Sequence, residues 1–427
     1  LGDVYKRQNS LFEIKEDTAK DATVAAAAQK IIDRIDKEYG AVFAKSEVEL
    51  NGAKAPNGNR DSETNNGDLI TDAMVWKILQ DKESLTVDAD HVVAVTNGGG
   101  IRKAINPGDV TKKNINEVLP FGNTVVTIYI TGAELLEALE ASTYCTPDAI
   151  GGFPQVSGIN YTISTAVAYD ANAETYPAST YYGPKSINRV TINSINGKEF
   201  KADDTYAVIT NDFCGGGGDT YYAFAAATAK FDTGIPLDEV VMEYITAELK
   251  GVIGKQYAAP QGRILMNPFA DVKASSWFGK YVIDLYNDGI INGTSATTYA
   301  PNNTLTWAAA LKLLLVSNGD LKAADATGAD WSKNAIAKAA ELGLVAADLD
   351  GAKAISRLEF CQVAAKLNKL AESKTESKFT DCTDGYVMAL VDAKVISGMT
   401  ETTFEPAASL TRAQIAKILY QLTLIEK

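Results

Sequence analysis

The last third of the chain repeats one unit, and this repetition limits the folds open to it. Residues 269–315 and residues 379–422 are two copies of one pattern. Four landmark residues recur between them at a constant offset: Tyr281, Gly293, Pro301 and Trp307 correspond to Tyr386, Gly398, Pro406 and Arg412. A middle copy with a shorter loop runs from Trp331 through ISRLEFCQVAAKL. Each copy predicts a helix, a glycine turn, a loop ending near a proline and a second helix, and each needs its neighbours to bury one face.

Strands and helices alternate in the preceding part. HVVAVTNGGGIR (91–102) is a β-branched run followed by glycines, and TYAVITNDFCGGGGDTYYAF (205–224) repeats that design. NTVVTIYITGAELLEALEAS (123–142) predicts a strand and then a helix, with Thr131 and Glu134 spaced as a capping box. The alternation predicts an α/β or α+β domain with ligand-binding loops at strand ends. Neither glycine run has the spacing of a dinucleotide or P-loop motif.

One arginine, Arg60, stands ahead of an Asn-rich turn and an amphipathic helix. Apolar residues from Leu69 to Ile78 recur three and four apart, which predicts a helix from about Asp68. The turn at 65–67 suits a helix start, where unpaired N–H groups favour anions. Taken alone, Arg60 is better interpreted as a solvated surface residue, and it needs partners elsewhere to form a site.

Bulk properties exclude some classes of protein. A chain of 427 residues is expected to hold about two to four domains. Its net charge of −14 argues against a nucleic-acid partner, which needs clustered Lys and Arg. No apolar run is long enough to predict a membrane span. The cysteines, which show neither metal spacing nor a disulfide framework, are Cys145, Cys214, Cys361 and Cys382.

Residues 1–45 predict no domain. The chain lacks an initiator Met, and LGDVYKRQ continues no pattern, so we interpret it as an artefactual end from cloning or assembly. The segment 18–44 predicts one long linker helix, of a kind that packs against or connects to something upstream. The chain is therefore expected to be a fragment.

Five motifs resemble, in order, those of the 5'-nucleotidase C-terminal domain. They are NGGGIR (97–102), LPFGN (119–123), TGAELLEALE (131–140), FPQVSG (153–158) and NDFCGGGGDTY (211–221). RDSETNNGDLITDA matches the family's Arg-led opening segment, and the likeness covers residues 46–267. The resemblance implies a domain that binds the nucleoside part of the substrate. It also implies a separate metallophosphoesterase domain with two metal ions, to which interdomain rotation brings the substrate.

The resemblance assigns a substrate pocket to this domain. Its residues are Arg60, Asn97, Arg102, Phe121, Asn123, Phe213 and Asp219. The two phenylalanines would clamp a base, at roughly 1–3 kcal/mol per stack. The Asp219 carboxylate can accept from both ribose hydroxyls, while Arg60 and Arg102 suit ribose and phosphate oxygens. Singly, these could be core aromatics and a turn aspartate; the ordered set favours a substrate pocket.

The family's catalytic half needs several His and Asp ligands for two divalent metal ions, and this sequence has one histidine, His91. At the start of a strand, a lone histidine is expected to be structural. The resemblance therefore implies no catalytic residue, metal or cofactor in this chain, and it places both ions in a catalytic domain that the sequence lacks.

The repeats resemble surface-layer homology repeats, three of which form an all-α pseudo-trimer. The copies are residues 268–318, 319–371 and 372–427. The family binds an anionic secondary cell-wall polysaccharide in grooves between repeats. Its signature arginine falls on Arg357 and Arg412, while the first copy has Trp307. Asp271 and Asp381 carry over as further polymer-binding residues. Alternatively, the arginines only cap or bridge helices.

Two functions fit this sequence. The first is an extracellular nucleotide hydrolase anchored to a Gram-positive wall or S-layer, of which this chain is the substrate-binding and anchoring part and is inactive alone. The second is a non-catalytic surface-layer protein that binds nucleotides or serves as a scaffold. We favour the hydrolase, because a complete set of substrate residues is hard to explain without a substrate. Upstream metal-ligand motifs such as Asp-x-His would decide between them.

Overall fold

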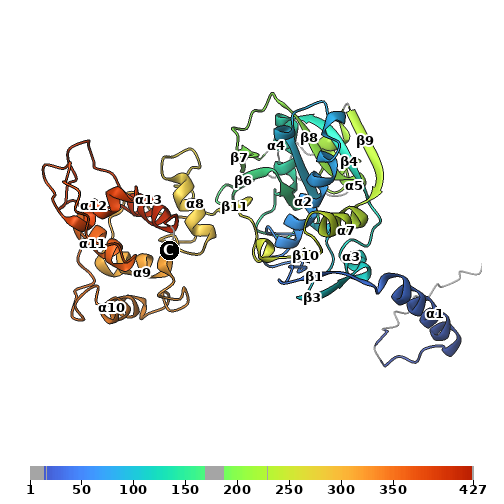
Figure 1. Cartoon of the computed structure of the whole chain (residues 1–427), viewed down its shortest axis with the longest axis horizontal. Coiled ribbons are helices and arrows are strands. Elements are labelled where there is room, and N and C mark those ends of the chain that lie inside the picture. The colour runs from blue at the N-terminus through green and yellow to red at the C-terminus, as the bar shows by residue number, and fades with distance from the viewer. Residues whose placement is uncertain (1–13, 16, 169–186, 228, 426–427) are drawn as a thin grey trace, which may run out of the picture.

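The computed structural model describes residues 14–15, 17–168, 187–227 and 229–425. A mixed α/β part precedes a helical part, as the sequence predicts, and strand β11 leads from the first into the second (Figure 1). At this junction the Asn287 side chain accepts from the backbone nitrogen of Met266 and donates to its carbonyl oxygen, both at 2.9 Å. The opening LGDVYKRQ lies outside the described residues.

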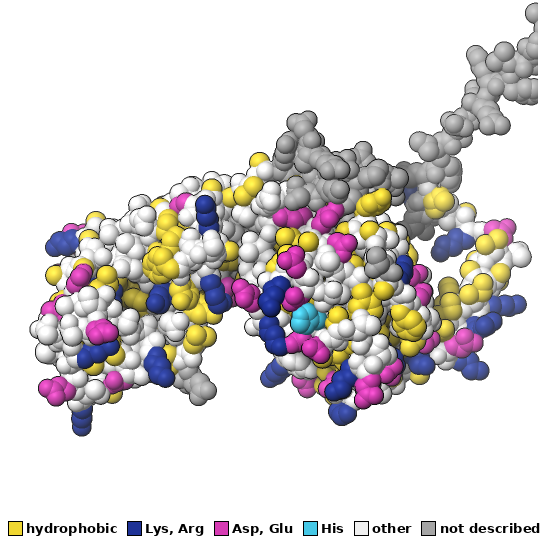
Figure 2. Space-filling model, turned by 90° about the horizontal axis from the view of Figure 1, so that it is seen from above, with side chains coloured by type: hydrophobic (Ala, Val, Ile, Leu, Met, Phe, Trp, Pro, Cys, Tyr) yellow, Lys and Arg dark blue, Asp and Glu magenta, His cyan; other side chains and the backbone are white. Residues whose placement is uncertain are grey.

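The helix expected over 18–44 is shorter in the structure. Helix α1 spans Ala22–Tyr39, and strand β1 follows at Val42–Ser46. Gly40 ends the helix; a Cβ there would lie 2.2 Å from the Asp36 carbonyl oxygen. Strand pairing with β3 and β10 then overrides the helical pattern of the residues that follow. None of the α1 side chains is buried, and apolar ones lie uncovered along it (Figure 2, right).

A five-stranded mixed sheet forms the centre of the α/β part. In spatial order its strands are β5 (Pro154–Ser157), β2 (Val92–Asn97), β8 (Thr205–Asn211), β4 (Thr124–Thr131) and β9 (Ala229–Pro236). The pair β2 and β8 is parallel and the other pairs are antiparallel. All six positions of β2 are buried, which matches its run of apolar residues.

Helices cover both faces of this sheet. Along β2, Val92 and Ala94 belong to one apolar core, whereas Val93 and Val95 belong to another. Alternation with a period of two residues separates the two faces in this way. The first core includes residues of α2 (Asn65–Leu79) and α7 (Leu237–Ala247), and the second includes residues of α4 (Gly132–Ser142). Thr131 and Glu134 form the predicted capping box of α4.

Smaller elements surround the sheet. One three-stranded sheet has the order β10 (Val252–Ile253), β1, β3 (Gly108–Thr111), and another has the order β11 (Ile264–Asn267), β6 (Ile159–Ser164), β7 (Val190–Ile195). The short α-helices are α3 (Lys112–Val118), α5 (Asp212–Gly215) and α6 (Tyr222–Ala225). The 3-10 turns are η1 (Lys82–Ser84), η2 (Ala89–His91), η3 (Gly98–Gly100) and η4 (Lys255–Tyr257).

The helical part is a ring of three similar units. Its helices are α8 (Gly279–Asn287), α9 (Trp307–Asn318), α10 (Trp331–Glu341), α11 (Arg357–Leu367), α12 (Gly385–Asp392) and α13 (Arg412–Thr423). At equivalent positions, backbone N–H groups donate at 2.8 Å to the next unit: Trp307 to Lys353, Arg357 to Ala408, and Arg412 to Asn303. The last of these bonds returns to the first unit. The three units therefore close on one another with pseudo-three-fold symmetry.

Charged side chains of both signs are interspersed over the face seen in Figure 2, with no single basic patch. Among the described residues, no helix combines the length and the apolar character that crossing a bilayer requires.

Candidate functional site

Two exposed phenylalanines lie on neighbouring loops at one end of the central strands β4 and β8. Phe121 precedes β4 and is 59% exposed; Phe213 follows β8, in α5, and is 46% exposed. The strands are antiparallel, and Val125 pairs with Asn211, so the start of β4 lies beside the end of β8. Large aromatic side chains usually bury most of their surface, which makes this exposure informative. The structure thus places the two phenylalanines that are predicted to clamp a base at the same end of the sheet, with their rings partly exposed.

A hydrogen bond joins the two loops. The Asn123 amide donates to Asp212 Oδ1 at 2.6 Å, and the Thr124 backbone nitrogen donates to the same oxygen at 3.3 Å. Asp212 is adjacent to Phe213 in the chain. A small pocket lies beneath, and its lining includes Phe121, Asn123 and Asn211. The Asn123 amide thus joins the loops that carry Phe121 and Phe213, and its contact with substrate stays a prediction.

The glycine run after Phe213 is explained by how closely the Phe213 ring approaches its backbone. A Cβ at Gly218 would lie 2.5 Å from the Phe213 ring, so the ring rests against this backbone. The next residue, Asp219, has φ of 52°, in the left-handed region that aspartate tolerates better than most residues. The run therefore turns sharply at Asp219, directly after the glycine that contacts the Phe213 ring.

Asp219 is buried and held by a chain of two asparagines. Asn97 at the end of β2 donates to Asp219 Oδ2 at 2.8 Å. Asn211 donates to Asn97 Oδ1 at 3.1 Å, and its own side chain accepts from the Cys214 backbone nitrogen as the cap of α5. Burial raises the pKa of Asp219, opposed by the Asn97 hydrogen bond and by the charge of Arg60. The parallel pair of strands β2 and β8 thus positions this carboxylate.

The two predicted arginines differ in surroundings. Arg60 Nε is buried and has no hydrogen-bond partner in the described part of the chain, although the arginine's charge acts on Asp219. Arg102 is exposed, donates to the Gly99 carbonyl oxygen at 3.0 Å, and lies over the Phe121 ring at 5.4 Å from its centroid. Both cations thus act on residues of the predicted pocket, Arg60 through its charge on Asp219 and Arg102 through its place over Phe121.

The helix after Arg60 begins earlier than predicted. Helix α2 starts at Asn65, because the Thr64 hydroxyl accepts from the Gly67 backbone nitrogen and caps it. The residues at 65–67 are thus its first turn, and Arg60 lies four residues before the cap rather than at the helix entrance. Gln155, whose role no sequence pattern indicates, holds this loop: its side chain donates to the Ser62 carbonyl oxygen at 2.7 Å and accepts from the Thr64 nitrogen at 3.0 Å.

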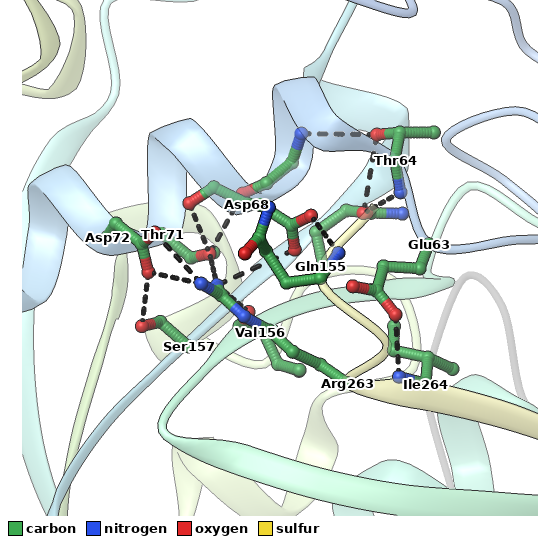
Figure 3. A network of polar contacts seen from close by, with 12 residues as sticks. Glu63, Thr64, Asp68, Thr71, Asp72, Gln155, Val156, Ser157, Arg263 and Ile264 are labelled. Carbon is green, nitrogen blue, oxygen red and sulfur yellow. Dashed lines mark hydrogen bonds and ion pairs between the residues drawn. The ribbon is translucent and has the colours of Figure 1, made fainter. Parts of the chain in front are cut away.

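Behind this loop lies a buried acidic network (Figure 3). Arg263 donates to the Asp72 carboxylate at 2.8 Å and lies 3.5 Å from Asp68. Glu63 accepts from the Ile264 backbone nitrogen at 2.7 Å. Burial, and secondly the charge of Glu63, raise the pKa of Asp68 to about 8, while burial also raises the pKa of Glu63. One guanidinium therefore faces more carboxylates than it can neutralise, and the network favours a bound proton.

His91 occupies a separate place. Its ring lies 2.6 Å from Asp90 and 3.4 Å from Asp204, and Lys198 also pairs with Asp90. Burial lowers the pKa of His91, but the bonds to the two aspartates outweigh it and raise that pKa. A shallow concavity of about 780 Å³ lies beside it, away from the aromatic clamp. The described residues contain no cluster of three or more His, Cys, Asp or Glu able to hold a metal ion.

The two signature arginines reach across the ring of helical units. Arg357 donates to the Ser397 carbonyl oxygen at 2.8 Å and lies over the Phe404 ring. Arg412 makes the matching contacts, to the Asn292 carbonyl oxygen at 2.7 Å and over the Tyr299 ring. Each arginine therefore ties its own unit to the glycine loop of the next. This is the bridging role that the sequence left open as an alternative.

A groove of about 570 Å³ adjoins the first of these arginines. Its lining includes four cations and no carboxylate: Arg357, Lys378, Lys394 and Lys417. The exposed indole of Trp277, from the first unit, also lines it. Arg357 is buried, and its Nε has no partner among the described residues. In a chain of net charge −14, such a local excess of positive charge favours an anionic ligand.

Asp271 and Asp381 hold turns. Asp271 accepts from the backbone nitrogens of Tyr299 and Ala300, at 2.8 and 2.7 Å. Asp381 accepts from the equivalent Phe404 and Glu405 at 2.8 Å each. Both carboxylates are thus bonded to backbone at a residue of positive φ, and their contact with polymer stays a prediction.

Known proteins resemble the two parts of the chain separately. Residues 42–226 match the family described as 5'-nucleotidase, C-terminal domain, and residues 268–310 and 381–416 match the S-layer homology domain. The trifunctional nucleotide phosphoesterase protein YfkN of Bacillus subtilis is 33% identical over 261 residues, which cover 61% of this chain and 16% of that protein. Human 5'-nucleotidase is 28% identical over 268 residues, covering 62% and 43%.

Among solved structures, the 5'-nucleotidase precursor from Thermus thermophilus is similar with a TM-score of 0.44 and 31% identity, over 57% of this chain and 42% of that one. The chain spans less than half the length of each of these three proteins.

Proposed function

We propose that this chain, in which a 5'-nucleotidase C-terminal domain precedes S-layer homology domains, binds the substrate of a nucleotide hydrolase and anchors it to the bacterial surface. The observation that carries the proposal is the grouping of Phe121, Phe213 and Asp219, with the charge of Arg60 acting on Asp219. Exposed rings on adjoining loops suit a base, a buried carboxylate suits a ribose diol, and a guanidinium suits a phosphate.

The chain's own residues bind and orient the nucleoside in this proposal. Asn97 donates to one oxygen of Asp219 at 2.8 Å, which fixes the direction from which the carboxylate meets a ribose hydroxyl. Arg102 lies over Phe121 and adds positive charge at the rim of the clamp. Hydrolysis is assigned to two divalent metal ions in a metallophosphoesterase domain. No residue of the described chain is given a catalytic step.

The S-layer homology domains indicate attachment to the cell surface. We assign an anionic secondary cell-wall polysaccharide of a Gram-positive type bacterium to the cationic groove at Arg357. Four cations without a carboxylate in the groove, and an indole that can stack on a sugar ring, support this assignment. The protein is then extracellular and held at the wall or S-layer while its nucleotidase domain meets nucleotides in the medium.

Calorimetry of the pure chain tests the substrate role. Adenosine and AMP are each titrated with and without Mn²⁺, and phosphate release from AMP is followed in parallel. Weak binding of both ligands without hydrolysis is the expected result. Absence of binding to either ligand favours the non-catalytic scaffold, and metal-dependent phosphate release contradicts the division of labour.

A further inference from the structure

Strand β9 forms an open edge of the central sheet. It pairs with β4 on one side, and within the described residues no strand pairs with its other side (Figure 1). The first four residues of β9 are all exposed. An open edge presents unpaired backbone N–H and C=O groups, which are able to pair with another strand.

A large apolar side chain stands on this edge. Phe231 is 64% exposed, more than either clamp phenylalanine. It lies opposite Thr127 of β4 and so shares a face of the sheet with Tyr129. On that face a groove of about 580 Å³ is lined in part by Ile78, Leu85, Tyr129, Phe231 and Ile235. The exposed ring and the apolar groove together form an apolar surface, and covering it would remove that surface from water and lower the free energy.

The charges beside Phe231 indicate what covers it. Lys230 and Asp232 flank the ring with opposite signs, and both are exposed. They lie opposite Ile128 and Val126 on β4, and so point to the other face of the sheet. If two copies of β9 pair antiparallel about a two-fold axis at Phe231, Lys230 of each copy faces Asp232 of the other. Cross-strand pairs of opposite charge stabilise a sheet, whereas like charges destabilise it.

Neighbouring registers lack this match. An axis at Lys230 or at Asp232 places identical charges opposite each other. An axis between two residues is excluded, because it would pair side chains that point to opposite faces of the sheet. Only the axis at Phe231 gives two ion pairs on one face and two facing rings on the other, beside the groove. The edge is thus complementary to itself in one register, as a two-fold interface requires.

We infer that a second copy of this chain pairs with the β9 edge, with the two Phe231 rings in contact at the axis. The pairing continues the central sheet through both copies and covers the apolar groove on each. It does not depend on the proposed substrate role, because none of the clamp residues lies on β9.

Charge exchange between two variants tests the register. Lys230→Asp leaves only acids at positions 230 and 232, and Asp232→Lys leaves only bases, so each variant alone repels itself. Sedimentation velocity of the full chain across a concentration series is expected to show a dimer for the wild type. Each single variant should weaken dimerisation on the order of tenfold, since two like-charge pairs replace two ion pairs. An equimolar mixture of the two variants should restore a dimer, which native mass spectrometry identifies as mixed.

Lys333→Asp is the matched control, because it reverses the charge of an exposed residue on α10, outside β9. This variant should dimerise as the wild type does. Phe231→Glu should also weaken the dimer, with circular dichroism showing that the fold is kept. A wild type that is monomeric at every concentration overturns the inference. So does a dimer that both charge variants retain, or one that is lost only on Ile31→Glu in the uncovered helix α1.

Discussion

Asn123, two residues after Phe121, and Asp212, next to Phe213, are joined by a hydrogen bond of 2.6 Å. One residue belongs to the loop before β4 and the other to the start of α5, so the bond fixes the distance between two loops that are far apart in the chain. We expect Asp212→Ala to weaken adenosine binding by about 1 kcal/mol, since the bond involves a charged but solvent-exposed acceptor. Asp212→Asn keeps an acceptor oxygen and should recover most of the affinity. Titration calorimetry of both variants checks this; equal losses would mean that the carboxylate charge, rather than the bond, is what matters.

Removing either clamp ring should weaken binding more. Phe121→Ala and Phe213→Ala are each expected to cost about 1–3 kcal/mol of adenosine affinity, because a base loses one stacking face. Phe231→Ala is the control, since Phe231 is equally apolar and still more exposed but lies on β9. Calorimetry that finds adenosine affinity unchanged in both clamp variants would remove the pocket assignment.

Asp219 should discriminate between ribose and 2'-deoxyribose. In the wild type, we expect adenosine to bind about tenfold more tightly than 2'-deoxyadenosine, through one charge-assisted hydrogen bond. Asp219→Ala removes both acceptor oxygens and should bring this ratio close to one. The ratio of the two affinities is the measurement, so a general loss of binding does not imitate the effect. A ratio that stays unchanged would move the ribose away from Asp219.

Stability should depend on pH through Asp68. Burial raises its pKa from 3.8 to about 8 in the folded chain, so the folded state binds more protons than the unfolded state between these values. The free energy of unfolding must then fall as pH rises through this window. Asp68→Asn imitates the protonated acid and should flatten the pH dependence and raise the melting temperature at pH 8. Asp330→Asn, at an exposed position, serves as the control. Identical calorimetric profiles for wild type and Asp68→Asn would contradict the bound proton.

The repeats should retain the chain on cell-wall sacculi. Arg357→Ala and Arg412→Ala are each expected to lower retention about tenfold, through lost charge-assisted bonds and a loosened ring. Lys417→Ala tests the groove with less effect on the fold, because Lys417 is exposed and lines it. Lys322→Ala, which is exposed and outside that lining, is its control. Trp307→Arg should retain the chain at least as well as the wild type does.

Sacculi stripped of their polysaccharide separate polymer binding from other attachment. If stripped sacculi retain the wild type and the Arg357 and Lys417 variants equally well, the groove does not bind the polymer. High salt should weaken diffuse attraction more than binding in a fitted groove.

Much of the fold could be predicted because its signals are local. The capping box of Thr131 and Glu134 depends on two residues three apart. The helices of the repeats could be predicted because the copies can be compared with one another. The end of α1 at Gly40 and the strand at Val42 could not be read in the same way, since pairing with β3 and β10 decides them. The start of α2 was misplaced because Thr64 caps the helix while Asn65 and Asn66 are buried inside the domain.

The candidate site shows the same division. The order of the motifs predicts a pocket at Phe121, Phe213 and Asp219, and the register of β4 and β8 places the loops that carry them side by side. Asp212, Gln155 and Asn211 stand in the same motifs, but their roles could not be predicted, because each makes hydrogen bonds between segments distant in sequence. Nor could the motifs distinguish an arginine that binds polymer from one that bridges two units, and Arg357 is placed to bridge.

The closure of the helical ring has a mechanical consequence. The α/β part enters the ring at its first unit, next to α8, and that unit is bonded both to the second unit at Lys353 and to the third unit at Arg412. A force that pulls the α/β part away from the ring is therefore divided between two interfaces instead of passing along a single row of units. Detaching the first unit requires both interfaces to break together, so a closed ring of three small units resists such a force better than an open row of the same units.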